Sequence, residues 1–200
     1  MYTPPKFKVE DPEVIGNFIR EHAFGLLLTV SGTEIHDTHT PFVLTDDGHL
    51  LGHIARANPQ WSHWTADTVA KVIFSGPHAY ISPNYYASEF NVPTWNYTAV
   101  SVSGRLSVIE DEASVLAFLA KLTAQFEKGD SAWTLDRDDA RYMKLLSGIV
   151  VFSITMDQVE ASFKLNQNKA EEDQQRVISS LRNTGCPFDA SVASLMKSKE

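Results

Sequence analysis

The chain has 200 residues, of which 43% are hydrophobic and 21% charged, and its formal net charge is −8. These values are typical of a globular protein that can bury a core without covalent cross-links. A negative net charge disfavours binding to a phosphate backbone unless basic residues gather on one face, and the sequence contains no such cluster. The single cysteine, Cys186, excludes an internal disulfide and favours a reducing compartment.

The apolar segments of the sequence indicate neither export nor membrane insertion. Residues 1–14, MYTPPKFKVEDPEV, lack the basic-then-apolar pattern of a signal peptide. The apolar run at 24–30, FGLLLTV, is far too short to span a bilayer. We therefore expect a cytoplasmic protein that does not associate with membranes.

The first predicted elements are a helix and a buried strand. Asp11-Pro12 has the form of an N-cap followed by proline at the first helical position. Apolar residues then recur at helical spacing, which predicts an amphipathic helix to about His22. The run AFGLLLTV predicts a buried strand over residues 23–30.

A β-hairpin is predicted over residues 35–56, because two strand-like runs flank Asp47-Gly48, a dipeptide suited to a type I′ turn. With a two-residue loop, His39 faces Arg56, Pro41 faces Ile54, and Phe42 faces His53. Side chains alternate along strands, so His39 and Arg56 would share one face while His53 lies on the other. A slip of one residue would reverse every one of these assignments.

The rest of the sequence predicts further strands and peripheral helices. Asn58-Pro59 begins a short segment that carries two tryptophans, and residues 68–82 predict a strand interrupted at Gly76-Pro77, as at an edge or a bulge. The remaining predicted elements are a loop at 84–95, strands at 98–110 and 149–156, helices at 111–128, 136–147 and 171–183, and a short helix after Pro187. About six strands with helices between them favour a mainly antiparallel barrel in a single domain.

Common catalytic and metal-binding motifs are absent from the sequence. His36 and His39 are three residues apart on a predicted strand and so point to opposite faces. Neither HExxH nor paired CxxC occurs, and GxSxG, GxGxxG and GxxxxGK[ST] are also missing. Scattered histidines with local hydrogen bonds are therefore the preferred interpretation of the seven histidines.

Three polar segments leave functional and structural interpretations open. In GHIARANPQW (52–61), Arg56 can bind a phosphate with its planar fork, or can simply end a strand before an Asn-Pro helix start. TWNY (94–97) offers flat rings and an amide suited to a planar heterocycle, or an aromatic corner packed on the protein's own core. FKLNQN (163–168) alone is better explained as a solvated turn.

Six segments, MYTPPKF, HTPFVL, GHIARANPQW, FSGPHAYISPNYY, VPTWNY and KLNQN, occur in this order. Together they resemble the PaiB-type FMN-binding family, often labelled negative transcriptional regulators, over residues 1–182. The resemblance implies an FMN-binding split β-barrel of the pyridoxamine-phosphate-oxidase-like kind, mainly β with peripheral helices. It also implies a homodimer with flavin sites at the interface. We expect one such domain over 1–184 and a C-terminal tail over 185–200.

The resemblance also implies which residues contact the flavin. The residues carried over are Thr38, His39 and Thr40 along the isoalloxazine, His53, Ile54 and Ala55 on the adjacent strand, Arg56, Asn58 and Gln60 at the ribityl phosphate, Trp95 and Asn96 closing the pocket from the same or a partner subunit, and Lys164 and Gln167 nearby. The sequence departs from the family pattern at Asn84-Tyr85-Tyr86, where serine usually precedes Trp-Tyr, and at Asn166, where serine is usual.

Three functions remain open from the sequence. The first is a flavoprotein that acts as an FMN-dependent oxidoreductase or as a flavin-dependent sensor, with the electron chemistry supplied by the flavin. No residue is a persuasive general acid or base, and His39 and Tyr97 are candidates only if they reach the edge of the flavin. The second is a transcriptional regulator that works through a partner protein, because a DNA-binding motif and a basic helix are both absent. The third is an interaction module without a cofactor.

Overall fold

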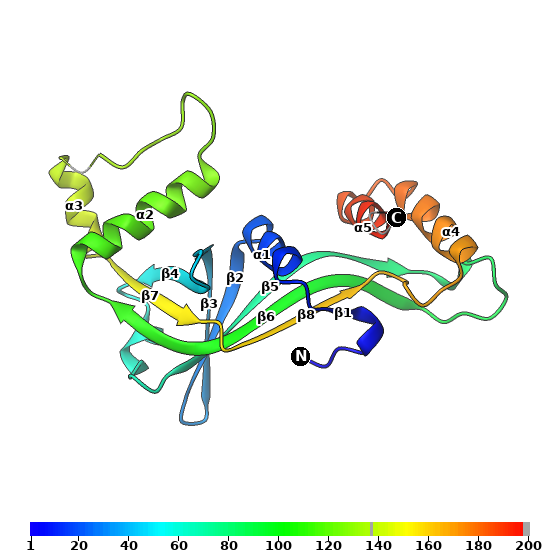
Figure 1. The fold of residues 1–200 in the computed structure, drawn as a ribbon, viewed down its shortest axis with the longest axis horizontal. Coiled ribbons are helices and arrows are strands. Elements are labelled where there is room, and N and C mark those ends of the chain that lie inside the picture. Colours follow the sequence, from blue (N-terminus) through cyan, green and yellow to red (C-terminus); the bar gives the residue numbers. More distant parts are fainter. Residues whose placement is uncertain (137, 198–200) are drawn as a thin grey trace. The chain divides into compact units, whose positions relative to one another are not determined.

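The computed structural model describes residues 1–136 and 138–197, and the chain divides into two compact units. Unit 1 comprises Met1–Ile15, Ser75–Val100 and Glu160–Glu200, and unit 2 comprises Gly16–Phe74 and Ser101–Val159. Strands β5 and β6 contribute residues to both units. The helices and strands are labelled in Figure 1.

The described residues form eight strands, five α-helices and three short 3-10 helices. The strands are β1 (Lys8–Val9), β2 (Phe24–Ser31), β3 (Glu34–Leu44), β4 (His49–Ala55), β5 (Val69–Ile81), β6 (Thr94–Ile109), β7 (Ile149–Thr155) and β8 (Gln158–Lys164). The helices are α1 (Pro12–Glu21), α2 (Glu112–Phe126), α3 (Ala140–Leu146), α4 (Glu171–Arg182) and α5 (Pro187–Lys197), with η1 (Pro5–Phe7), η2 (Pro59–His63) and η3 (Pro83–Tyr85).

The strands of unit 2 form a closed barrel. Their order among the described residues is β5-β2-β3-β4-β7-β6, and β6 also lies beside β5, which closes the ring. The side chains that alternate into the interior are almost completely buried, among them Leu27, Phe42, Leu50, Phe74 and Phe152. Phe42 packs edge-on against Phe74, with ring centroids 5.5 Å apart. The predicted mainly antiparallel barrel is therefore confirmed.

The turn between β3 and β4 is not the predicted type I′ turn. The backbone N–H of Gly48 donates to the carbonyl oxygen of Thr45 over 3.1 Å, and Gly48 has a φ of 78°. This is the geometry of a longer loop in which a type I turn is followed by a left-handed glycine. The predicted register is consequently wrong by one residue, and Phe42 pairs with Gly52.

In the observed register, the side chains of β4 lie on the opposite faces, relative to those of β3, from the faces that the sequence predicts. Ile54 points into the barrel interior, where it is 3% exposed, whereas His53 lies outside against Phe118 of α2, with ring centroids 5.7 Å apart. His39 does not face Arg56 and instead pairs with Leu26 of β2. The register therefore gives no support to the predicted pairing of these two motifs.

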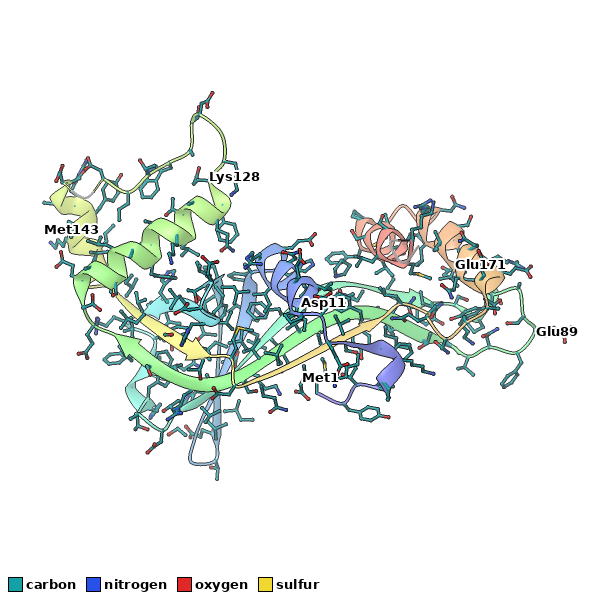
Figure 2. The ribbon with its side chains drawn as sticks, viewed as in Figure 1. Met1, Asp11, Glu89, Lys128, Met143 and Glu171 are labelled. Carbon is teal, nitrogen blue, oxygen red and sulfur yellow. The ribbon has the colours of Figure 1, made fainter. Side chains whose placement is uncertain are left out.

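The helices of unit 2 begin at side-chain caps. The carboxylate of Asp111 accepts a hydrogen bond from the N–H of Ser114 over 2.8 Å at the start of α2, as predicted. Helix α2 packs Phe118 against the outer face of the barrel. Helix α3 begins after Asp139, later than the predicted start at Asp136, and residue 137 of that prediction lies outside the described residues. Figure 2 labels Met143 on α3 and Lys128 beyond the end of α2.

Unit 1 consists of a sheet covered by two helices. Within this unit the strand order is β1-β8-β6-β5, and α4 and α5 lie side by side (Figure 1). Ile81 of β5, Leu181 of α4 and Val192 of α5 are buried in one core cluster. The helix that the sequence predicts after Pro187 thus forms and contributes to this core.

The strands of unit 1 differ from the prediction in three ways. Strands β1 and β8 are not predicted, and β6 begins at Thr94, so that TWNY lies within a strand rather than before one. Strand β5 continues through Pro77 without the predicted interruption. Because β5 is the edge strand of this unit, proline can occupy it without removing a ladder hydrogen bond.

The loop after η3 is held by polar contacts to α4 and to the segment before it. The carboxylate of Asp173 accepts hydrogen bonds from the N–H and the hydroxyl of Ser88 and from the N–H of Ala87, and these bonds hold the pKa of Asp173 below its ordinary value. Asn166 has a φ of 62° and donates to the hydroxyl of Tyr86 over 3.2 Å. Asparagine tolerates this left-handed conformation better than most residues.

No helix within 1–136 and 138–197 is long and apolar enough to cross a membrane. The predicted division of the chain into a domain at 1–184 and a tail at 185–200 remains a prediction.

Candidate functional site

Arg56 occupies a rigid position where β4 ends. Its Nε donates to the carbonyl oxygen of Ser147 over 2.8 Å, and its Nη2 donates to the carbonyl oxygen of Ile149 over 2.9 Å. The guanidinium lies over the ring of Trp61 at 5.4 Å, and the indole N–H donates to the carbonyl oxygen of Arg56. Nη1 makes no hydrogen bond to the described residues. An exposed, pre-oriented guanidinium of this kind can bind an anion.

Three of the predicted site residues form a single hydrogen-bonded network beside Arg56. The amide oxygen of Gln60 accepts from the hydroxyl of Thr38 over 2.6 Å, and the amide nitrogen of Asn58 donates to the same hydroxyl over 2.8 Å. The oxygen of Asn58 also caps η2 by accepting from the N–H of Gln60. Gln60 is 2% exposed and donates to Thr29 as well. Gln60 therefore holds η2 against β3 and has no surface for a ligand.

The other predicted residues on β3 and β4 divide between the barrel interior and its surface. Thr40 and Ile54 are each 3% exposed, and the hydroxyl of Thr40 donates to the carbonyl oxygen of His53 over 2.5 Å. His53 is half-buried under α2, and this burial lowers its pKa, which keeps the imidazole neutral at neutral pH. His39 and Ala55 are exposed, and His39 stacks on the exposed ring of Phe24 with centroids 5.9 Å apart.

The remaining predicted residues lie in unit 1 and form a group of their own. Lys164 on β8 donates through Nζ to the hydroxyl of Thr94 and to the carbonyl oxygen of Trp95. Burial, followed by the charge of Lys6, lowers the pKa of Lys164. Gln167 is occupied by backbone contacts, accepting from the N–H of Leu165 and donating to the carbonyl oxygen of Phe163. Lys164 thus anchors the start of β6.

Trp95 and Asn96 point to opposite faces of β6, as neighbours on a strand must. Trp95 is 52% exposed, whereas Asn96 is completely buried. The amide nitrogen of Asn96 reaches the sulfur of Met196 on α5 at 3.6 Å, and its buried oxygen has no hydrogen-bond partner among the described residues. Only Trp95 of this pair is available on the surface of unit 1.

The sequence does not predict the cluster of aromatic side chains that surrounds Trp95. Tyr80 packs edge-on against Trp95 with centroids 5.9 Å apart, and His78 lies between Trp95 and Phe188, at 6.1 Å and 5.3 Å. The alternation of His78 and Tyr80 on one strand could have indicated a shared face. Phe188 lies on α5, more than a hundred residues after His78 and Tyr80, and no local pattern relates it to them.

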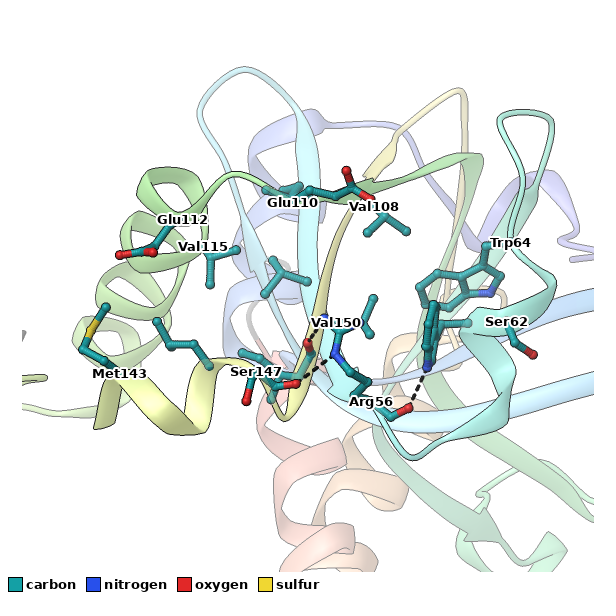
Figure 3. Close-up of a pocket in the computed structure, with 15 residues that line it drawn as sticks. Arg56, Ser62, Trp64, Val108, Glu110, Glu112, Val115, Met143, Ser147 and Val150 are labelled. Carbon is teal, nitrogen blue, oxygen red and sulfur yellow. Dashed lines mark hydrogen bonds between the residues drawn. The ribbon is translucent and has the colours of Figure 1, made fainter. Parts of the chain in front are cut away.

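A cavity of about 740 Å³ lies in unit 2 next to Arg56 (Figure 3). It is bounded by η2, the end of β6, the start of α2, α3 and the start of β7. Its walls include two tryptophans, several aliphatic side chains and two glutamates. The described residues contain no group of three or more His, Cys, Asp or Glu side chains that could hold a metal ion.

Comparison with known proteins matches residues 1–158 to the family described as "Putative FMN-binding domain". The chain is 37% identical over 203 residues to the Bacillus subtilis protein "Protease synthase and sporulation protein PAI 2", covering all of this chain and 98% of that protein. Among solved structures, an FAD- and haem-binding protein from Mycobacterium smegmatis has a TM-score of 0.64 at 16% identity, over 83% of this chain and 78% of that one. A flavocytochrome from Azotobacter vinelandii has a TM-score of 0.64 at 15% identity, over 84% and 75% of the two chains.

Proposed function

Because the chain belongs to this FMN-binding domain family and has the split-barrel fold, we propose that it binds FMN in unit 2, with the phosphate at Arg56. The observation that carries the proposal is the fixed, exposed guanidinium at the end of β4, which keeps an unused nitrogen. Two backbone carbonyls and the Trp61 ring orient this group before any ligand arrives, which reduces the entropy lost on binding.

The chemistry of the donor set fits a phosphorylated flavin. The predicted residues of unit 2 comprise hydroxyls, amides, two imidazoles and one guanidinium, with no carboxylate among them. A site without negative charge suits a phosphate, and the exposed rings of His39 and Phe24 offer flat surfaces to an isoalloxazine. The polar groups of Thr38, Asn58 and Gln60 bond to one another. These residues therefore support the proposal by holding η2 against β3 next to Arg56, and not by contacting the flavin.

The bound FMN would supply electron-transfer chemistry, and the protein would bind and orient it. His39 is the exposed candidate for a proton donor or acceptor in unit 2. This assignment supports either an FMN-dependent oxidoreductase or a flavin-dependent sensor. A stopped-flow trial of flavin reduction by nicotinamide cofactors separates the two, because only an oxidoreductase should be reduced and reoxidised repeatedly with an acceptor.

A flavin titration tests the proposal itself. Adding FMN to flavin-free protein should quench flavin fluorescence saturably and shift the visible absorption bands, because the ring leaves water for a protein surface. Riboflavin should bind at least about tenfold more weakly, since it lacks the charge-assisted bonds of the phosphate. Absence of binding at high micromolar FMN would exclude the flavoprotein function.

We also propose that the protein is a homodimer in which Trp95 of one subunit covers the flavin of the other. Val30, Ile35 and Val69 of unit 2 lie together and are 64%, 71% and 63% exposed, an apolar surface that a second copy would bury. Trp95 rather than Asn96 is the available residue, because Asn96 is buried under α5. Sedimentation velocity should give about twice the chain mass of 22.3 kDa, and a monomer at tens of micromolar would exclude this assembly.

A regulatory role is the second candidate function, and it rests on the resemblance to the PaiB-type family, which is often labelled negative transcriptional regulators. The net charge of −8 opposes direct contact with DNA, so regulation would act through a partner protein in the cytoplasm. A gel-shift experiment at physiological salt should detect no tight, sequence-selective DNA binding by the pure protein. Such binding would overturn the indirect route.

A further inference from the structure

Lys164 is held by two uncharged acceptors on the neighbouring strand. It is the last residue of β8, and its Nζ donates to the hydroxyl of Thr94 and, over 2.7 Å, to the carbonyl oxygen of Trp95 on β6. It makes no ion pair with any residue in 1–136 or 138–197. A neutral amine has two N–H bonds and an ammonium group has three. The two acceptors therefore satisfy the neutral amine completely, and its lone pair remains available for a reaction.

A second lysine acts on this amine. Lys6 belongs to η1, which leads into β1, and β1 pairs with β8 with Lys8 opposite Ser162. Partial burial and, after it, the charge of Lys6 lower the pKa of Lys164, so that more of its side chain is neutral near pH 7. Lys6 itself makes no ion pair in the described part of the chain. Desolvation and a neighbouring cation are the two effects that make a lysine nucleophilic at neutral pH.

Lys164 and Tyr97 lie on the same side of the sheet of unit 1. Side chains two residues apart share a face of a strand, so Ser162 and Lys164 share a face of β8. The hydroxyls of Tyr97 and Ser162 are 3.3 Å apart, so Tyr97 of β6 points to that same face. Asn96 points to the opposite face and is buried under α5. The amine thus lies near a phenol ring that the flavin proposal does not use, and all of these residues belong to unit 1.

We propose that Lys164 is a nucleophilic amine that forms an imine with an aldehyde, and that Lys6 attracts an anionic group on the same aldehyde. The lone pair of Nζ attacks the carbonyl carbon, and one proton moves from the nitrogen to the carbonyl oxygen. That oxygen then leaves as water with the second proton of the nitrogen, and a carbon–nitrogen double bond forms. The step needs no oxidant or reductant. This site goes beyond the proposed function, because it takes an aldehyde on unit 1 and works without the flavin.

Reductive trapping tests the reactivity of Lys164. The flavin-free full chain is incubated at neutral pH with 4-formylbenzoate and cyanoborohydride, which reduces an imine to a stable amine. Peptide mapping by mass spectrometry then gives the labelling rate of each lysine. Lys164 should be labelled at least about fivefold faster than the exposed Lys121 and Lys144, because desolvation and Lys6 favour its neutral form. Labelling of Lys164 at or below the rate of these two lysines would overturn the proposal.

Two variants test the role of Lys6, with Lys121 as the internal standard. Lys6→Gln should slow the labelling of Lys164 by 4-formylbenzoate about fivefold, because it removes the like charge beside the amine and the cation that attracts the carboxylate. The loss should be smaller for benzaldehyde, which has no carboxylate. Lys8→Gln is the matched control, since Lys8 is already paired with Glu10, and it should leave the rate unchanged. An unchanged rate in Lys6→Gln, or equal slowing in both variants, would overturn the proposal.

Discussion

Replacing Arg56 with alanine should weaken FMN binding by about 10- to 100-fold, because a charge-assisted pair to phosphate contributes roughly 1.5–3 kcal/mol. Riboflavin has no phosphate, so its affinity should change by less than about threefold. Arg56→Lys should give an intermediate loss for FMN, since lysine keeps the charge but cannot reproduce the planar fork that bonds two carbonyls. Fluorescence titrations measure the affinities of both variants for FMN and for riboflavin, relative to those of the wild type.

Two controls separate this effect from general damage. Arg56 also joins the end of β4 to the start of β7, so urea unfolding of each variant must accompany the titrations. Arg105→Ala removes another exposed arginine of unit 2 that does not line the cavity, and it should leave both flavin affinities unchanged. Equal losses for FMN and riboflavin in Arg56→Ala would show that Arg56 does not hold the phosphate.

Gly104→Ala should destabilise the protein by about 4 kcal/mol or more, which corresponds to a fall in Tm of roughly 10 °C for a chain of this size. A Cβ at Gly104 would lie 1.7 Å from the carbonyl oxygen of Thr155, a backbone atom that cannot rotate away. Strand β6 pairs with β7 just beyond this point, from Leu106 onward. The added methyl group would therefore force apart the strands that close the barrel.

Thermal unfolding monitored by circular dichroism measures this effect. Gly16→Ala is the matched control, because the Cβ there meets mainly the flexible end of Arg20, and alanine in a helix is favoured by up to about 1 kcal/mol over glycine. The control should be soluble and at least as stable as the wild type. A Gly104→Ala protein with an unchanged Tm would contradict the close approach of β6 and β7.

The sequence predicts the elements that carry local signals. Helices α1 and α2 begin at the aspartates that the sequence indicates, and the carboxylates cap them. The β3–β4 hairpin is predicted but its register is not, because Asp47-Gly48 fits two loop lengths equally well. Strand β8 is not predicted although its sequence, QVEASFK, alternates between polar and apolar residues, and its pairing with β1 in unit 1 joins residues that no short window of sequence contains.

The candidate site is only partly predictable for the same reason. The motif GHIARANPQW locates Arg56. The burial of Gln60 cannot be predicted from this motif, because it depends on hydrogen bonds to Thr38 and Thr29, which are distant in sequence. Asn96 looks available in the sequence, yet Met196 of α5 covers it. The cavity combines residues between Arg56 and Val151, so its walls become visible only in three dimensions.

A structure from crystals soaked with FMN tests most directly the claim that FMN binds in unit 2 with its phosphate at Arg56. The account predicts flavin density at unit 2, with phosphate oxygens within hydrogen-bond distance of the Arg56 guanidinium and the ring on the exposed surface of β3 and β4. Ordered FMN whose phosphate lies on other residues would contradict it, as would crystals without flavin density at concentrations that saturate binding in solution.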